Sequence, residues 1–109
     1  MKTIPSSAKE RKRYIRIKVD ADWKVEKEDV SRLVIQAGLQ FLGELNMARA
    51  GIQLLPETWK NNTAVLRVGH KYVDETKAAL ALIKEYEGKT ITISATKVSG
   101  TIEGVRYAT

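Results

Sequence analysis

A chain of 109 residues, 43% of them hydrophobic, can build one compact domain around a single core. It has no cysteine, which excludes disulfides, thiol nucleophiles and thiolate metal sites. It also has neither the roughly 18 apolar residues of a membrane span nor a secretion signal, so we expect a soluble, cytoplasmic protein. The formal net charge of +6 leaves three explanations open: nucleic acid binding, attraction to an anionic membrane surface, or solubility alone.

The positive charge is concentrated at the start of the chain. Residues 1–18 contain seven basic side chains and one acidic side chain, whereas the remaining residues contain 12 of each. Lysine and arginine bind nucleic acids by displacing the counterions condensed on the phosphates. We therefore predict a flexible basic arm at residues 1–12, ahead of a single α+β domain at residues 13–109. The predicted phosphate-binding residues are Lys9, Arg11, Lys12, Arg13, Arg16 and Lys18.

The first ordered element is predicted to be a strand at residues 14–19, where apolar and polar side chains alternate. Such alternation is typical of a strand with one buried face. The inward residues are Ile15, Ile17 and Val19, and the outward residues are Tyr14, Arg16 and Lys18. The basic arm therefore continues onto one face of a sheet.

A helix is predicted from about residue 26 to residue 45, because acidic residues at its start suit the helix dipole. Its core-facing stripe consists of Val30, Leu33, Val34, Ala37, Phe41 and Leu45. A second apolar group lies on nearly the opposite side and consists of Ile35, Leu39 and Leu42. One sheet cannot cover both groups, so the second group is a candidate protein interface. Alternatively, Trp59 or the C-terminal segment covers it within the molecule.

A hairpin is predicted next. Residues 51–55 form a short strand ended by Pro56, residues 63–68 form another, and two asparagines between them supply turn residues. Trp59 lies in the long connection, where an aromatic side chain is more often a packing residue than a platform for base stacking.

The pattern then predicts a second helix from Val73 to Tyr86, with Gly88 as its C-terminal cap. Residues 90–98 alternate again and form the last strand, while the conformation of residues 99–109 stays open. The order is therefore βαββαβ, which is typical of a ferredoxin-like or RNA-recognition-motif-like α+β sandwich: a four-stranded antiparallel sheet with both helices on one face.

The other face of this sheet is expected to be left to solvent or to a ligand. Its residues would be Tyr14, Arg16, Lys18, Arg67, Thr92, Ser94 and Thr96. RNA-recognition domains stack bases on aromatic residues of their central strands, but the third strand here contains none. Sequence-specific stacking of single-stranded RNA therefore fits poorly.

No catalytic group stands out in the sequence. The single histidine, His70, has no second histidine or cysteine with which to bind a metal, so we expect a surface or capping role. The acidic residues gather at helix starts, and Ser99-Gly100-Thr101 lacks the spacing of a phosphate loop. We expect no catalysis and no cofactor on the protein itself. A small ferredoxin-like hydrolase of acyl phosphates ranks last, because no glycine loop with an adjacent arginine is visible.

Five segments, taken in order, resemble the Pop-family protein of ribonuclease P, which is called component 2 in archaea. They are Arg13–Ile15, Phe41–Leu45, Ala64–Val68, Lys77–Ile83 and Val98–Ile102, the last being the most distinctive. Family members often continue with a basic tail, whereas this chain continues with Glu103-Gly104-Val105-Arg106. A C-terminal contribution to RNA contact is therefore in doubt.

The resemblance implies a non-catalytic subunit of an RNA-based endoribonuclease that removes the 5′ leader from precursor tRNA. In that family the RNA and its bound magnesium perform the hydrolysis. The implied partners are ribonuclease P RNA and the barrel-shaped thirty-kilodalton protein subunit, with a possible homodimer inside a heterotetramer. A second hypothesis keeps the fold but treats the chain as a protein-protein assembly module without direct RNA contact.

Overall fold

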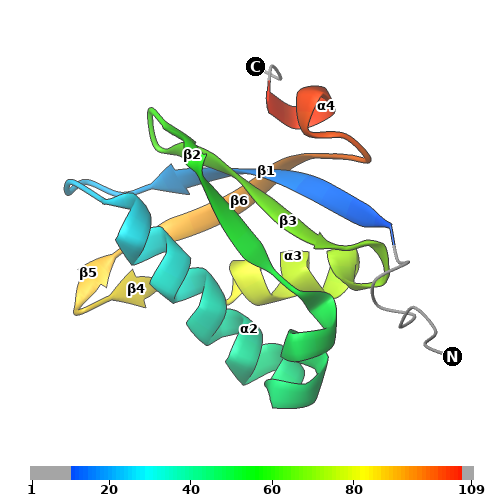
Figure 1. The fold of residues 1–109 in the computed structure, drawn as a ribbon. Coiled ribbons are helices and arrows are strands. Elements are labelled where there is room, and N and C mark those ends of the chain that lie inside the picture. The colour runs from blue at the N-terminus through cyan, green and yellow to red at the C-terminus, as the bar shows by residue number, and fades with distance from the viewer. Residues whose placement is uncertain (1–10, 107–109) are drawn as a thin grey trace, which may run out of the picture.

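The computed structural model describes residues 11–106 and contains a four-stranded antiparallel sheet in the order β2-β3-β1-β6 (Figure 1). Helices α2 and α3 cover one face, and the short α4 lies on the other. The elements are β1 (Lys12–Asp20), α2 (Lys27–Ala50), β2 (Gln53–Lys60), β3 (Thr63–Gly69), the 3-10 turn η1 (His70–Tyr72), α3 (Val73–Ala81), β4 (Glu85–Tyr86), β5 (Lys89–Thr90), β6 (Thr92–Ser99) and α4 (Ile102–Arg106). The predicted fold class is confirmed.

The core lies between the sheet and the two larger helices. On β1, Ile15 and Ile17 have no exposed surface, and the alternation predicted for this strand is confirmed. Their partners on β3, Leu66 and Ala64, are 0% and 1% exposed. Each of the isoleucine and leucine side chains contributes about 1.5–3 kcal/mol through burial. The strand begins earlier than its apolar pattern suggested, at Lys12, so the basic residues and the core share one rigid element.

Helix α2 breaks at Gly43, whose φ of 82° and ψ of 165° are not helical. The part after the break folds back, so that a Cβ atom at Gly38 would lie only 2.5 Å from the sulfur of Met47. The predicted stripe is therefore wrong beyond Ala37. Phe41 and Leu45 are 46% and 63% exposed, because a stripe calculated for one straight helix does not continue through a bend.

The β2–β3 hairpin is tighter than predicted. Strand β2 continues through Pro56 to Lys60, and Asn61 and Asn62, both with positive φ, form a two-residue turn. Proline is tolerated because β2 is an edge strand. The register is irregular after Leu55, where the hydroxyl of Thr58 accepts the N–H of Val65 at 2.8 Å. The predicted long connection is therefore wrong.

Helix α3 ends at Ala81, not at Tyr86. The chain then forms a small hairpin of β4 and β5, with Glu87 and Gly88 in its turn at φ values of 52° and 80°. The glycine that the sequence suggested as a helix cap is a turn residue, because positive φ serves both structures equally well. Tyr86 is only 7% exposed and joins the core from the hairpin.

Strand β6 carries a bulge against β1. Ile17 pairs with Ala95 but Arg16 pairs with Lys97, so Thr96 is an additional residue. The extra residue reverses the alternation beyond it. As a result Val98 packs against the core, and Lys97 shares the opposite face with Arg16.

The second sheet face is partly covered, which corrects the expectation that it is left open. Helix α4, in the segment whose conformation had stayed open, lies against β1, β3 and β6 (Figure 1). Val105 of α4 has no exposed surface, and Val65 on β3, the neighbour of Arg16, is 2% exposed. The guanidinium of Arg16 donates to the Val105 carbonyl at 3.1 Å.

The turn before α4 explains why the segment after β6 is distinctive. The Ser99 hydroxyl accepts the N–H of Thr101, and the Thr101 hydroxyl accepts the N–H of Gly104. A Cβ atom at Gly104 would overlap with Ser99, whereas at Gly100 the nearest atom of those compared, in Arg13, would be 3.7 Å away. Gly104 is therefore required by close packing.

We predict that Gly104→Ala lowers the free energy of unfolding by about 1–3 kcal/mol, because Ser99 must move and the packing of α4 against the sheet is disturbed. Urea denaturation followed by circular dichroism measures the change. Gly100→Ala is the matched control and should alter stability by less than about 0.5 kcal/mol. Equal effects of the two substitutions would contradict the packing explanation.

Candidate nucleic-acid interface

Three of the predicted cations lie together at one end of the sheet. Arg11, Lys12 and Arg13 are at the start of β1, where a shallow hollow opens between them and the turn before α4. The residues lining it are Arg11, Lys12, Arg13, Tyr14, Gly100 and Thr101. None of these described lining residues carries a carboxylate, so their side chains make the potential of the hollow positive. We refer to Arg11, Lys12, Arg13 and His70 as the basic end.

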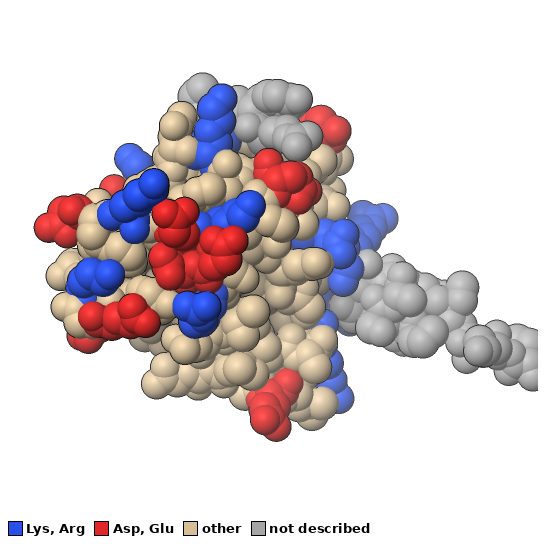
Figure 2. Space-filling view, turned by 60° about the vertical axis from the view of Figure 1, so that its left-hand side comes forward, with Lys and Arg blue, Asp and Glu red and all other residues tan. Residues whose placement is uncertain are grey.

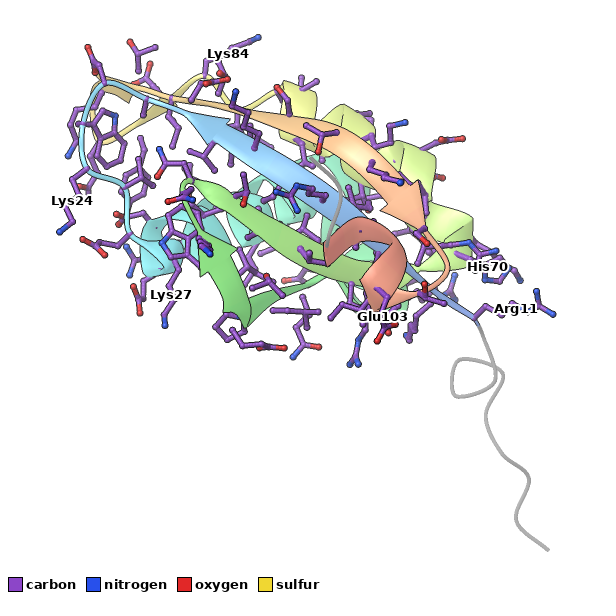
Figure 3. All side chains as sticks on the ribbon, turned by 90° about the horizontal axis from the view of Figure 1, so that it is seen from above. Arg11, Lys24, Lys27, His70, Lys84 and Glu103 are labelled. Atoms are coloured by element: carbon purple, nitrogen blue, oxygen red, sulfur yellow. The ribbon has the colours of Figure 1, made fainter. Side chains whose placement is uncertain are left out.

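His70 belongs to this end because η1 follows β3, the antiparallel neighbour of β1. The backbone N–H of His70 donates to the Arg11 carbonyl at 2.9 Å, and the Nδ1 atom lies 3.2 Å from the same oxygen. A carbonyl can only accept, so this contact is a hydrogen bond in the tautomer that has its proton on Nδ1. Figure 3 shows His70 and Arg11 at the same end of the molecule. The expected capping role of His70 is consistent with this contact.

Two glycines lie beside the other basic side chains. The ammonium nitrogen of Lys12 is 3.8 Å from where a Cβ atom of Gly51 would be, and a guanidinium nitrogen of Arg13 is 3.7 Å from the corresponding position at Gly100. Arg13 also donates to the Lys12 carbonyl at 3.2 Å. Neither side chain has a carboxylate partner among the ion pairs found between residues 11 and 106.

The remaining predicted phosphate-binding residues lie elsewhere. Lys9 is outside the described residues. Arg16 is half-buried and held against the α4 carbonyl, so its first role is structural. Lys18 is exposed on the same sheet face but lies six residues from Lys12, which is about 20 Å along a strand. The six cations therefore do not form one patch.

The opposite end of the molecule differs in charge. Figure 2, which faces the end with β4 and β5, shows basic and acidic side chains intermixed there. An aromatic cluster lies at this end: Trp23 stacks on Tyr86 with ring centres 6.1 Å apart, and Lys89 lies 4.1 Å from the Trp23 ring. Arg32 donates to the Tyr86 hydroxyl, which raises the pKa of its guanidinium further above its already high ordinary value. This cluster was not predicted from the sequence.

The second apolar group of α2 is only partly covered. Ile35 and Leu39, about one helical turn apart, are 44% and 43% exposed. Leu42 is half-buried and packs against the core, as does Trp59, whose predicted packing role is confirmed. Neither Trp59 nor α4, on the far face of the sheet, buries Ile35 and Leu39.

Two further kinds of feature are absent from residues 11–106. No group of three or more histidine, aspartate or glutamate side chains is arranged to hold a metal ion there. No helix in the same range is long and apolar enough to cross a membrane.

Comparison with known proteins gives the family. The sequence profile of the Rpp14/Pop5 family matches residues 13–109, nearly the whole chain. The chain belongs to the Rpp14/Pop5 family. It is 32% identical over 106 residues to ribonuclease P protein component 2 of Pyrococcus abyssi, covering 97% of this chain and 90% of the relative. It is 33% identical over 102 residues to the protein of that name from Methanocaldococcus jannaschii, covering 94% and 75%.

The fold of this Rpp14/Pop5 protein is also found in a solved assembly. A chain in the cryo-EM structure of yeast ribonuclease MRP superimposes with a TM-score of 0.68, covering 93% of this chain and 79% of that one. The two sequences are only 14% identical, so this likeness shows the fold alone.

We predict that Arg16→Ala lowers the free energy of unfolding by about 1 kcal/mol, because the Val105 carbonyl loses a charged donor in a half-buried position. Lys18→Ala removes the same charge from the same face of the same strand, but from an exposed side chain, and should leave stability within about 0.5 kcal/mol. Thermal unfolding of both variants measures the difference. Equal losses would show that Arg16 does not secure α4.

Proposed function

We propose that this Rpp14/Pop5 protein is a non-catalytic subunit of ribonuclease P that binds the catalytic RNA through its basic end and supports removal of the 5′ leader from precursor tRNA. The proposal is supported by family membership and by the relatives named ribonuclease P protein component 2. The observation that carries the RNA contact is the grouping of Arg11, Lys12 and Arg13 around a hollow whose lining, within residues 11–106, includes no carboxylate.

The chemistry of this end favours phosphate as the ligand. The arginines offer planar pairs of donors that match phosphate oxygens, and Lys12 adds a point charge. Tyr14 is half-buried at the wall of the hollow, and it is the one aromatic residue among the described residues that line it. Such a site fixes the position of a nucleic acid backbone, whereas base identity is left to the fold of the RNA.

We assign the hydrolysis itself to the RNA and to magnesium ions bound to it, with no cofactor on the protein. On this proposal the protein holds RNA elements in place and supplies no general acid, base or nucleophile. Turnover by the purified polypeptide without RNA would overturn this division of labour.

The first test removes the basic end. Replacing Arg11, Lys12 and Arg13 together with Ala should weaken RNA binding and reduce the slope of log affinity against log salt by about 2–3, because each phosphate contact contributes about 0.7–0.9 to that slope. Filter binding at several salt concentrations gives the slope. The melting temperature should stay nearly unchanged, since these side chains lie outside the core.

The matched control removes three exposed lysines away from the basic end, Lys24, Lys27 and Lys60. Lys24 and Lys27 lie at the other end of the molecule from Arg11 (Figure 3). The control changes the net charge by the same amount, but the slope of log affinity against log salt concentration should stay close to that of the parent protein. If both triple variants lose the same affinity, the protein attracts RNA only through its overall charge.

The second test addresses the proposed protein interface, Ile35, Leu39 and Leu42, which we assign to the barrel-shaped thirty-kilodalton subunit. Replacing Ile35 and Leu39 with Asp should abolish copurification with that subunit, because charges would be buried without partners. Leu42 is left intact because it packs against the core. Leu82→Asp, at a side chain that is 57% exposed beyond α3, is the control. A complex that forms normally with the α2 variant would exclude this surface.

A further inference from the structure

The two edges of the sheet are not equivalent. Strand β2 at one edge carries Pro56 and Glu57 in its middle, and such residues discourage pairing with another strand. Strand β6 at the other edge has neither proline nor charge from Thr92 to Ala95. Its protective features, the bulge at Thr96 and the charge of Lys97, come only after that stretch. The unprotected part of the edge is therefore Thr92–Ala95.

The hydrogen-bond register shows which backbone groups face outward. Val19 of β1 donates its N–H to Asn62, on the β3 side, so its backbone groups point away from β6. Its partner across the other ladder, Ile93, therefore has its N–H and C=O on the outer side of β6. The same holds two residues on, at Ala95, and no other described strand pairs with this side of β6.

The chain itself begins the pattern that a further strand would continue. The N–H of Ile91, two residues before Ile93, donates to the carbonyl of Lys84 at 3.0 Å. The segment leading into β4 thus occupies the first position along the outer side of β6. The next outward groups, at Ile93 and Ala95, lie in line with it.

Helix α3 forms a surface beneath this edge of the sheet. Helix α3 packs under β6 and extends beyond its outer side (Figure 3). A hollow lies between α3 and β6 and is lined by all four residues 92–95. Neighbouring residues of a strand point to opposite faces of the sheet, so a hollow lined by four consecutive residues must run along the edge of the strand. Its floor is apolar, from Leu80, Ala81 and Ile83, and its charged lining residues are Lys77 and Lys84.

We propose that the Thr92–Ala95 edge of β6 is a docking site for an extended segment of a partner protein, which adds a fifth strand to the sheet. The unpaired backbone groups require a strand as the occupant, and the floor of the hollow suits a short apolar side chain at alternate positions. The two lysines favour a segment that also carries acidic residues. A second copy of this chain fits less well, since pairing of two β6 edges brings like charges together.

This inference rests on the proposed function only for the choice of partner, which we take to be a protein subunit of ribonuclease P. Hydrogen exchange of residues 92–95 is measured by mass spectrometry in the full chain alone, with ribonuclease P RNA alone, and with the purified protein subunits. We expect exchange to slow at least tenfold with the protein subunits only. Unchanged exchange with those subunits overturns the proposal, as does slowing by RNA alone or by raising the concentration of the isolated chain.

A pair of variants separates the backbone contact from the side chain. Ala95→Pro removes an outward N–H that the sheet does not use, and should weaken assembly with the protein subunits at least tenfold. Ala95→Ser keeps that N–H and should assemble as the parent does. Equal assembly of a folded Ala95→Pro variant overturns the proposal, and the exchange experiment decides if that variant does not fold. If exchange at residues 92–95 slows as expected but the parent chain does not stimulate leader cleavage, the result would count against the proposed function alone.

Discussion

The structure depends on the pairing of β1 with strands on both sides. β1 lies between β3 and β6, buries its apolar residues under the helices, and begins with the cations of the basic end. Because one strand carries both the core and the charge, the basic residues are held in a fixed register with respect to η1 and the turn before α4. The proposed phosphate-binding site, made of long, flexible side chains, would thereby gain a rigid base.

The two sheet faces have different uses. The inner face forms the core, whereas α4 covers part of the outer face and engages Arg16. Helix α4 occupies part of the surface on which RNA-recognition domains of this topology stack bases. RNA contact is therefore expected at the end of the sheet and not across its middle, and this agrees with the scarcity of aromatic residues on the central strands.

Much of the fold could be predicted from the sequence, because alternation over residues 14–19 and 90–98 and the apolar stripe of α2 are strong signals for burial. Features that depend on tertiary contacts could not. The break at Gly43 and the β4–β5 turn both rest on glycines with positive φ, and a positive φ is not visible in the sequence. The sequence correctly predicted several cations at the start of β1. It could not predict that the register with β3 places His70 beside them. Nor could it predict that Arg16 is bound to the backbone of α4 instead of lying with them.

The bulge at Thr96 determines on which face of the sheet each later side chain of β6 lies. If β6 paired with β1 at the same length but without the bulge, Thr96 would lie opposite Arg16 and Lys97 opposite Ile15, and the two faces would be exchanged for everything beyond Ala95. Val98 would then point toward α4, and a lysine would point into the apolar layer. Deletion of Thr96, in contrast, would leave Lys97 opposite Arg16 and Val98 opposite Ile15, so the end of β6 would keep its two faces in a regular ladder. The extra residue therefore matters because the sequence after it is written for the shifted alternation.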